Sequence, residues 1–384
     1  MDEKSTNILV FTSAFKPLIG GSEIAIESIA KNLPDIFFDI ITPRYDKKLP
    51  AIENEGNIRI YRVGLGNILD KFFFPITGYW LSRQLMKNKV YADFHAYQAS
   101  YGGLALYLLK TFQPSIRSIL TLQEGKDLDK QNWLVRFLRK KVIQKSDIVT
   151  AISIYLAEYA GRYTKNPAII IPNGVNLSIF NPSLFNEEAK ENLRKTIGIT
   201  RDDIVIVTAS RLVAKNGISH IIESADGVFS RISRVKYLII GDGPLWQQLR
   251  DKATNTNNRD RIIFTGAIEH HILPLYLSIS HLFIRPSETE GLGNAFLEAM
   301  AMGLPVLATP VGGIVDFIED NRTGFLWYRE KESLSQKIVG ILENSNVLSS
   351  VAQSGKNLVK AKYNWLEIAE KFRRIYQEKY EPKL

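Results

Sequence analysis

Two glutamates, Glu290 and Glu298, stand eight residues apart in a Gly-rich stretch of the chain. The run over 295–302 is apolar except for Glu298, and its composition fits a buried helix. A carboxylate in such a helix costs on the order of several kcal/mol unless it is hydrogen-bonded, and a pair of ribose hydroxyls would satisfy it. Glu290 precedes this helix, so its carboxylate can reach a ligand whose phosphates lie on the helix N-terminus. A structural salt bridge is the alternative for this pair.

Two cations, Arg211 and Lys215, follow a strand expected over 204–208 and precede an expected helix. The guanidinium of arginine can bind two oxygens of a pyrophosphate at once, and lysine adds a point charge. The spacing therefore predicts a diphosphate site, with a solvated basic loop as the alternative.

A third anion-binding candidate follows the first expected strand, where Gly20 and Gly21 precede a helix. Glycines let backbone amides approach an anion, and a helix N-terminus adds about half a positive charge. The stretch is neither a dinucleotide fingerprint nor a P-loop. A turn in which Ser22 caps the helix is the alternative.

These candidates need a scaffold, and the chain alternates strand-like and helix-like segments, which is typical of parallel α/β sheets. Strands are expected at 8–11, 37–42, 58–63, 118–122, 148–151, 204–208, 236–240, 262–265, 282–285 and 305–308, and helices at 102–112, 133–145 and 154–162. We predict two doubly wound α/β domains joined near 172–200, with the ligand where the carboxyl ends of both sheets face one cleft. Apolar spacing over 365–380 predicts a long amphipathic helix that covers a surface.

Several of these motifs resemble those of one enzyme family. The stretch from Pro286 through Glu298 to Ile314 resembles the retaining glycosyltransferases of family 4, also called group 1. Further similar motifs follow in the family's order: the Gly20-Gly21 loop, 171–175, the Arg211-Leu212 turn, 241–244 and 321–326. The resemblance covers nearly the whole chain, and it specifies the family but no substrate.

The resemblance implies a GT-B fold, in which two Rossmann-like domains face each other across a cleft. The acceptor domain would span 1–175 and the nucleotide-sugar donor domain 176–364. A C-terminal helix within 365–384 would cross back to the first domain.

The resemblance also assigns roles to residues of the donor domain. It places Glu298 on the ribose hydroxyls, Glu290 on the donor sugar, and Arg211 and Lys215 on the diphosphate, with Gly21 reaching the phosphate from the other domain. Backbone amides for the sugar and phosphate would come from one loop, namely Gly291, Leu292, Gly293 and Asn294. The residues expected to border the base are Ala267 and Ile268, followed by His270 and His271, which we expect to face solvent. The family generally needs no metal, and no cofactor besides the nucleotide-sugar co-substrate is expected.

Two positions depart from the family's pattern. Family members usually carry a histidine near the transferred sugar, where this chain has Gln123, which can hydrogen-bond but cannot take a proton. Glu124 is the nearest replacement. Lys215 stands one position earlier than the lysine of the family's pattern, and Asn216 occupies the usual lysine position. The long lysine side chain can absorb this shift. His95, expected just after a strand, is a further acceptor-side candidate, with a structural histidine as the alternative.

The net charge indicates an anionic partner. The 384 residues carry 49 Lys and Arg against 40 Asp and Glu, and most of the surplus falls within 1–180. We see no basic run interleaved with stacking aromatics and expect no nucleic acid. An anionic membrane surface fits the aromatic segment 71–80 and the basic helix 133–145, and ordinary helices with solvated faces are the alternative. Five cations lie in that helix: Arg136, Arg139, Lys140, Lys141 and Lys145.

The absence of cysteine excludes disulfides, thiolate zinc sites and cysteine nucleophiles. The apolar run at 8–11 is too short for a signal peptide, and the uncharged stretch 72–82 would cover about half of a ~30 Å bilayer core. We therefore expect a cytoplasmic protein, with peripheral contact at the inner face of the membrane.

These observations predict a retaining glycosyltransferase that moves a hexosyl unit from a UDP- or GDP-sugar to a hydroxyl of a glycan or lipid-linked acceptor. Such a reaction would serve cell-surface polysaccharide or glycolipid biosynthesis. The family expectation is front-side attack assisted by the leaving diphosphate, whose charge Arg211 and Lys215 would stabilise. The alternatives are a GT-B nucleotide-sugar epimerase, and a nucleotide-sugar-binding protein that has lost transfer, for which Gln123 is the hint.

Overall fold

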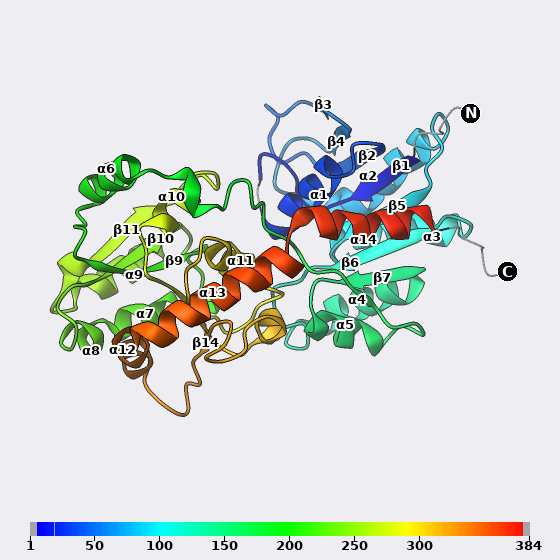
Figure 1. Cartoon of the computed structure of the whole chain (residues 1–384). Helices are drawn as coiled ribbons and strands as arrows, with labels where there is room; N and C mark the ends of the chain where they lie inside the picture. The colour runs from blue at the N-terminus through cyan, green and yellow to red at the C-terminus, as the bar shows by residue number, and fades with distance from the viewer. Residues whose placement is uncertain (1–5, 19, 379–384) are drawn as a thin grey trace. The chain divides into compact units, whose positions relative to one another are not determined.

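The computed structural model describes residues 6–18 and 20–378. The chain forms two compact units, each with its own parallel sheet and its own buried core (Figure 1). The first unit comprises Met1–Gly174 and Trp365–Leu384, and the second comprises Val175–Asn364.

The sheet of the first unit has eight strands in the order β3-β4-β2-β1-β5-β6-β7-β8. All neighbours pair in parallel except β3, which is antiparallel to β4. The strands are β1 (Thr6–Phe11), β2 (Ile36–Pro43), β3 (Ile52–Glu55), β4 (Ile58–Val63), β5 (Asp93–Tyr97), β6 (Ser118–Leu122), β7 (Ile148–Ala151) and β8 (Ile169–Ile170). The order reverses between β1 and β5, and such a switch point is where ligands of open α/β sheets bind.

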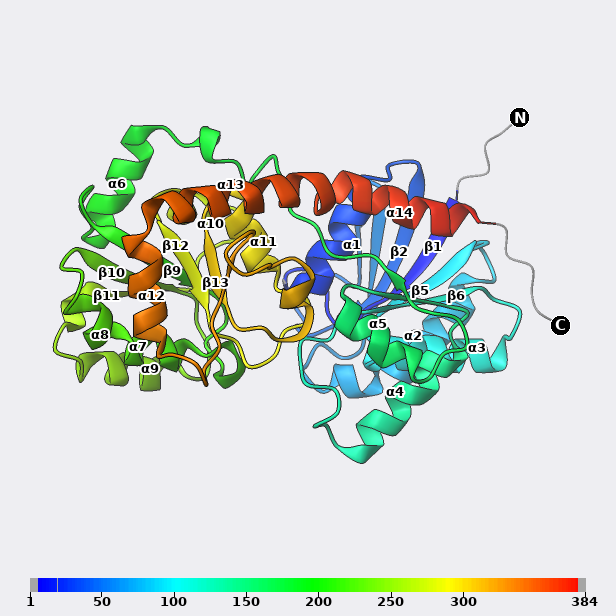
Figure 2. The same cartoon turned by 60° about the horizontal axis from the view of Figure 1, so that its bottom comes forward.

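Helices cover both faces of this sheet. They are α1 (Gly21–Lys31), α2 (Asp70–Leu85), α3 (Tyr101–Phe112), α4 (Trp133–Lys145), α5 (Ile154–Gly161) and α14 (Trp365–Gln377). Figure 2 shows α1 and α14 on one face of the sheet and α2 and α3 on the other. Alternate residues of the central strand, Ile8 and Val10, pack with Ile26 of α1 and Ile368 of α14 in one buried core.

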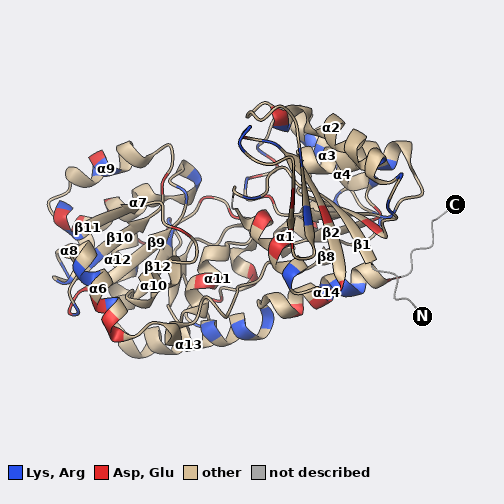
Figure 3. Cartoon of the chain, turned by 90° about the horizontal axis from the view of Figure 1, so that it is seen from above, with Lys and Arg blue, Asp and Glu red and all other residues tan. Residues whose placement is uncertain are grey.

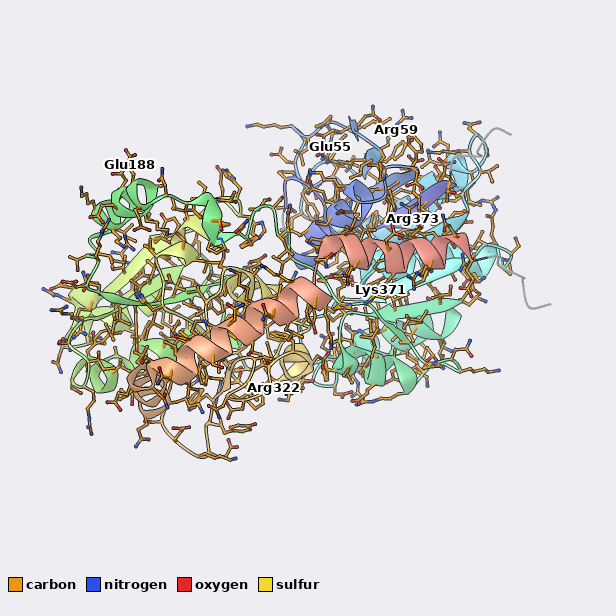
Figure 4. All side chains as sticks on the ribbon, viewed as in Figure 1. Glu55, Arg59, Glu188, Arg322, Lys371 and Arg373 are labelled. Atoms are coloured by element: carbon orange, nitrogen blue, oxygen red, sulfur yellow. The ribbon has the colours of Figure 1, made fainter. Side chains whose placement is uncertain are left out.

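Helix α14 confirms the amphipathic helix expected near the C-terminus. Its buried side chains recur at helical spacing: Trp365, Ile368, Ala369, Phe372, Ile375 and Tyr376. Charged residues of both signs occupy its other face (Figure 3). Arg373, labelled in Figure 4, binds Asp35 next to the first sheet and Glu370 on its own helix. The apolar stripe and this ion pair together fix the helix to the first unit.

The second unit has a six-stranded parallel sheet in the order β11-β10-β9-β12-β13-β14. The strands are β9 (Ile204–Ala209), β10 (Val235–Ile240), β11 (Ile262–Gly266), β12 (Leu282–Arg285), β13 (Val306–Ala308) and β14 (Phe325–Leu326). This order is the doubly wound order of dinucleotide-binding domains, with its switch point between β9 and β12.

Helices also sandwich the second sheet. They are α6 (Glu187–Ile197), α7 (Ile218–Glu223), α8 (Ala225–Phe229), α9 (Trp246–Thr254), α10 (Leu273–Ser278), α11 (Asn294–Ala301), α12 (Leu334–Glu343) and α13 (Ser345–Lys362). In Figure 2, α7, α8 and α9 lie on one face of the sheet, and α10, α11 and α13 lie on the opposite face. The two-layered cover is the one expected of a doubly wound sheet.

All ten expected strands and all three expected helices are present. Each expected end lies within two residues of the observed end. The stretch expected to join the domains is more ordered than predicted, because it contains the short helix η1 (Pro182–Leu184) and all of α6. Asn186 caps α6 by accepting from the Ala189 N–H at 2.9 Å, and Gly198 ends it with a φ of +71°. The helix is polar, with Leu193 its buried residue, so it lacks the apolar stripe that would have revealed it.

Candidate functional site

The turn that follows β9 carries both predicted diphosphate ligands at the switch point of the second sheet. Arg211 is exposed, and Lys215 is half-buried in a single 3₁₀ turn, η2 (Ala214–Asn216). Asn216 is buried, and its Nδ2 donates to the carbonyl oxygen of Arg211 at 2.7 Å. The asparagine in the family's lysine position therefore holds the turn closed, while Lys215 remains one residue away.

The loop that follows β12 lies against this turn. The backbone N–H of Glu288 donates to the carbonyl oxygen of Lys215 at 2.7 Å. Gly217 has a φ of +70°, and a Cβ there would lie 2.0 Å from the carbonyl oxygen of Pro286. Only a glycine permits this approach. The structure thus brings Arg211, Lys215 and the glutamate-bearing loop together at one edge of the sheet.

Glu290 is buried in that loop and makes the salt bridge that the sequence offered as the alternative to a ligand role. Its Oε1 lies 2.7 Å from Nη2 of Arg285 and accepts from Ser287 Oγ at 3.0 Å. Arg285, itself buried, also lies over the Phe296 ring at 4.8 Å. Arg285 was missed, although a basic residue that ends an otherwise apolar strand is a readable signal. The contact of Glu290 with a donor sugar stays a prediction.

The backbone between Glu290 and α11 is closely packed. Helix α11 begins at Asn294, and Gly293 precedes it with a φ of +98°. Gly312, with a φ of +54°, packs so close to the loop that a Cβ would lie 1.8 Å from the Glu290 carbonyl oxygen. Leu292 is buried, so it offers a ligand its backbone alone. Gly291 is buried as well, and Asn294 is half-buried.

Glu298 is buried on α11, and it does have a hydrogen-bond partner. Its Oε1 lies 2.8 Å from Nε2 of His270, a residue in the connection between β11 and α10. The expectation that His270 faces solvent is wrong, because this contact turns the imidazole toward α11. Ala267, which is exposed, and Ile268, which is half-buried, belong to the same connection. The structure therefore brings the loop that holds the residues predicted to border the base into contact with Glu298 through His270.

The first unit has its own switch-point loop. Gly20 is the N-cap of α1, and Gly21 is its exposed first residue. The alternative in which Ser22 caps the helix is wrong, since Ser22 lies in the first turn and donates to Glu23 Oε1 at 2.9 Å. Burial raises the pKa of Glu23, despite this hydrogen bond. The helix N-terminus thus receives no side-chain cap from Gly20, and the Glu23 carboxylate lies beside this glycine. Anion binding by Gly21 stays a prediction.

Gln123 and Glu124 follow β6 and are held by neighbours in the first unit. Gln123 Nε2 donates to Oδ1 of the buried Asn173 at 3.2 Å. Glu124 accepts two backbone N–H groups, from Ala99 at 2.6 Å and from Gln123 at 2.9 Å. Burial raises the pKa of Glu124, against the opposing charge of Arg139 and these N–H donors. Glu124 thus joins the ends of β5 and β6, and an acid–base role for it stays a prediction.

His95 is a structural histidine. It lies inside β5 and is fully buried, so the expectation that it follows the strand and lines an acceptor surface is wrong. Its Nδ1 lies 2.8 Å from the Tyr376 hydroxyl, and its Nε2 lies 2.6 Å from Thr121 Oγ1. Burial lowers the pKa of His95 to about 3, so the ring stays neutral.

Arg211, Lys215, Glu290, Glu298 and the loop 291–294 belong to the second unit. Gly21, Gln123 and Glu124 belong to the first unit. Within the described parts of the chain, no three His, Asp or Glu side chains are placed to hold a metal ion. Metal-independent activity remains a prediction from the sequence.

Two family models match this chain. Residues 19–179 match Glycosyltransferase Family 4, and residues 189–365 match Glycosyl transferases group 1. The boundary between the matches falls beside α6 and close to the division between the two units. The chain therefore belongs to the glycosyltransferases of this family, and it is a transferase.

Individual proteins agree with this assignment. An uncharacterized glycosyltransferase of Methanocaldococcus jannaschii is 27% identical over 96% of this chain and 98% of its own length. The alpha-monoglucosyldiacylglycerol synthase of Streptococcus pneumoniae is 27% identical over 71% of this chain and 57% of its own length. The Anabaena protein HepE, in complex with UDP and glucose, shares the fold with a TM-score of 0.77 at 18% identity, over 96% of this chain and 99% of its own. The fold is therefore GT-B.

Proposed function

We propose that this glycosyltransferase moves a hexosyl unit, with retention of anomeric configuration, from a UDP- or GDP-sugar to a hydroxyl of a glycan or lipid-linked acceptor. The reaction would serve cell-surface polysaccharide or glycolipid biosynthesis. The observation that carries the proposal is the pair of buried carboxylates, Glu290 and Glu298, that flank the start of α11 beside two cations. Acidic groups satisfy sugar and ribose hydroxyls, and cations satisfy phosphates, so this arrangement matches a nucleotide-sugar.

The chemistry of the proposed transfer is dominated by charge on the leaving diphosphate. As the glycosidic bond breaks, negative charge builds on the oxygen of that group, and preorganised cations and dipoles lower the barrier most. We expect Arg211 and Lys215 to supply positive charge to this group, and the N-terminus of α11 to supply its dipole. Gly293 has no side chain, so the first N–H groups of α11 receive no cap from it.

Glu290 would orient the sugar rather than react with it. Its Oε1 is held by the guanidinium of Arg285 and by the Ser287 hydroxyl, and these two contacts fix the direction of the carboxylate. A fixed acceptor for a sugar hydroxyl holds the anomeric carbon in position for attack. This division of roles is consistent with front-side attack assisted by the diphosphate, which needs no enzyme nucleophile.

Two related proteins support the choice of substrates. HepE binds UDP and glucose in its crystal structure, and the streptococcal relative is named for a diacylglycerol glycolipid. By analogy, we propose that this chain takes a nucleoside diphosphate hexose as its donor. Its acceptors would include lipid-linked molecules.

A lipid-linked acceptor fits the exposed surface of the first unit. None of the described helices is long and apolar enough to span a bilayer. Helix α2 nevertheless exposes Phe72, Phe73, Ile76 and Trp80. Helix α4 exposes Trp133 and Phe137 among basic residues, and Lys141 lies over the Phe137 ring. We propose that an anionic bilayer at the inner face of the membrane is the partner, because basic and aromatic side chains on one helix suit lipid headgroups.

One of the expected basic residues does not contribute to this surface. Arg139 is buried, and its Nη2 donates to Gln131 Oε1 at 2.7 Å. The exposed cations of α4 are Arg136, Lys140, Lys141 and Lys145. They leave a positive helix surface that is smaller than the sequence predicted but still continuous with its exposed aromatics.

Donor binding and donor breakdown test the proposal together. We expect stabilisation against heat by one series of UDP-, GDP- or ADP-sugars and its parent diphosphate, since a ligand at about 100 times its Kd stabilises by roughly 2.7 kcal/mol. Without acceptor, the enzyme should slowly release the nucleoside diphosphate. With acceptor, the transferred sugar should keep the α or β configuration that it had in the donor. Formation of an isomeric nucleotide-sugar would favour an epimerase, and binding without any breakdown or transfer would favour a degenerate binding protein.

A further inference from the structure

His270 is the residue through which the loop after β11 contacts α11. Its Nε2 lies 2.8 Å from Oε1 of Glu298, whose side chain is 10% exposed. An ionised carboxylate can only accept hydrogen bonds, so Nε2 carries the hydrogen and donates it. The contact therefore places a hydrogen on Nε2 in the neutral and in the charged imidazole alike, and it fixes the direction of the carboxylate.

A second side chain holds the imidazole from another direction. Phe180 is buried, and its ring lies 5.3 Å from the His270 ring at an interplanar angle of 54°. The Phe180 backbone is itself held, because its N–H donates to the carbonyl oxygen of Asn176 at 2.9 Å. The ring of His270 is thus packed against a rigid neighbour while its Nε2 binds Glu298.

We propose that His270 is a positioning residue for the ribose of the donor, acting through Glu298. This inference rests on the proposed function, in which Glu298 accepts the ribose hydroxyls. A carboxylate offers about four lone-pair sites, and His270 takes one of them. The remaining sites of the oriented carboxylate can receive the 2′- and 3′-hydroxyls without a further rotation of the side chain.

The benefit of this arrangement is preorganisation. A glutamate without a partner samples several rotamers, and binding must then order it, which weakens affinity. His270 orders the carboxylate before the nucleotide arrives. Removal of the imidazole should therefore weaken recognition of the ribose selectively, because it leaves the residues expected at the diphosphate in place.

The chain offers a matched control in the adjacent histidine. His271 lies in the same connection, but its side chain is 67% exposed and pairs with Glu269 at 3.2 Å instead of with α11. A substitution of His271 changes the same residue type in the same loop without touching Glu298.

The test compares ribose with 2′-deoxyribose. The dissociation constants of UDP, GDP and ADP and of their 2′-deoxy counterparts are measured by calorimetry for the full-length protein and for His270→Ala, His270→Gln and His271→Ala. We expect His270→Ala to weaken binding of the preferred ribonucleotide roughly five- to tenfold and to narrow its preference over the deoxynucleotide. His270→Gln, whose Nε2 can donate from a similar position, should restore much of the affinity and much of the preference for ribose. His271→Ala should change neither the affinity nor the preference.

Two outcomes would overturn this inference. One is unchanged affinity in His270→Ala, and the other is an equal loss for ribo- and deoxyribonucleotides, which indicates general damage to the pocket. A parallel measurement on Glu298→Ala separates the two proposals. If Glu298→Ala keeps the full preference for ribose, the role of Glu298 in the proposed function fails. If Glu298→Ala loses that preference while His270→Ala keeps it, only the role of His270 fails.

Discussion

The guanidinium of Arg285 lies 2.7 Å from the carboxylate of Glu290, and both side chains are buried within the second unit. A buried ion pair contributes little net stability as a pair, but removal of one partner leaves the other charge buried and unpaired. In this protein the pair stands at the end of β12 and at the start of the loop proposed to hold the donor. Its main consequence is therefore the placement of Glu290.

Arg285→Ala should lower the free energy of unfolding by about 3–5 kcal/mol and abolish transfer, because Glu290 loses its buried partner. Urea unfolding measures the first effect, and product formation measures the second. Arg211→Ala is the control for the effect on stability alone, since Arg211 is exposed and its removal should change the free energy of unfolding by no more than about 0.5 kcal/mol. The double variant Arg285→Ala/Glu290→Ala should lose less than the two single losses combined; simple additivity would show that the pair does not couple.

Glu298→Ala should weaken nucleoside diphosphate binding by about 1.5–3 kcal/mol, the range for a hydrogen bond to a charged group. Calorimetry on the free diphosphate measures this loss directly. Glu290→Ala should leave the same affinity nearly unchanged while it stops transfer, because its predicted partner is the sugar. Equal affinity in Glu298→Ala and the wild-type protein would remove Glu298 from the nucleotide site.

Glu124→Ala should lower the free energy of unfolding by roughly 1–3 kcal/mol, because the N–H groups of Ala99 and Gln123 lose their acceptor. Thermal or urea unfolding checks this, and Glu158→Ala on the exposed face of α5 is the control. If the acid side of the pH profile of transfer persists in a folded Glu124→Ala protein, that titration belongs to another group.

The stability of the second unit should depend on the protonation of His270. Burial opposes the charged imidazole, but the hydrogen bond and charge of Glu298 outweigh it and raise the pKa of His270 above 6.5. The folded state then binds this proton more tightly than the unfolded chain does. The extra stability of the wild-type protein over His270→Gln should be complete below pH 6.5 and should fall as pH rises through the raised pKa.

The groups around His270 support this sign. Glu298 faces it from α11, Phe180 contributes no charge, and Glu269 and His271 pair with each other in its own loop. Thermal unfolding of both proteins between pH 5.5 and 9, values chosen to span this titration, measures the difference. A difference that is constant over this range, or that grows with pH, contradicts a charged His270 paired with Glu298.

Reversal of the exposed charges on α4 should release the protein from anionic vesicles. Arg136→Glu, Lys140→Glu and Lys141→Glu together remove three cations at about 1 kcal/mol each near the surface and add three anions. Flotation with and without anionic lipid measures the effect. The control variant changes the net charge of the protein by the same amount, but on the second unit. It carries three substitutions of exposed residues: Lys195→Glu, Arg231→Glu and Lys331→Glu. Equal flotation of both triple variants would rule out α4 as the contact.

The sequence predicted the parallel sheets well, because alternating apolar strands and helical stripes are local patterns. Helix α6 was missed because it has no such apolar pattern: it buries little, and its polar sequence is typical of a linker. His95 shows that the end of a strand is hard to predict from sequence. The strand was expected to end before His95, but residues 93–97 form one fully buried strand. The burial of a histidine depends on Thr121 and on Tyr376, which lies 281 positions away.

The site could be predicted in its types but not in its pairings. Residue type and spacing singled out Glu290, Glu298, Arg211 and Lys215, whose roles in binding a donor stay predictions. Their partners were missed for different reasons. Arg285 stands close to Glu290 in the sequence and was overlooked at the end of its apolar strand. His270 reaches Glu298 from the loop after β11, a pairing between distant segments that the sequence alone does not bring together. A carboxylate in an apolar segment predicts that some partner exists, and three-dimensional packing decides which one.

The position of α14 has a consequence for synthesis of the protein on the ribosome. The first unit receives six buried side chains from this helix, yet the helix follows the 190 residues of the second unit, Val175–Asn364. At about 5–20 residues per second, roughly 10–40 s of translation separate the first 174 residues from the helix that completes their core. During that interval the apolar groove on β1, β2 and α1 is open, while the second unit can fold to completion. We therefore expect the part of the chain made first to depend most on chaperones, until the last helix emerges and covers its core.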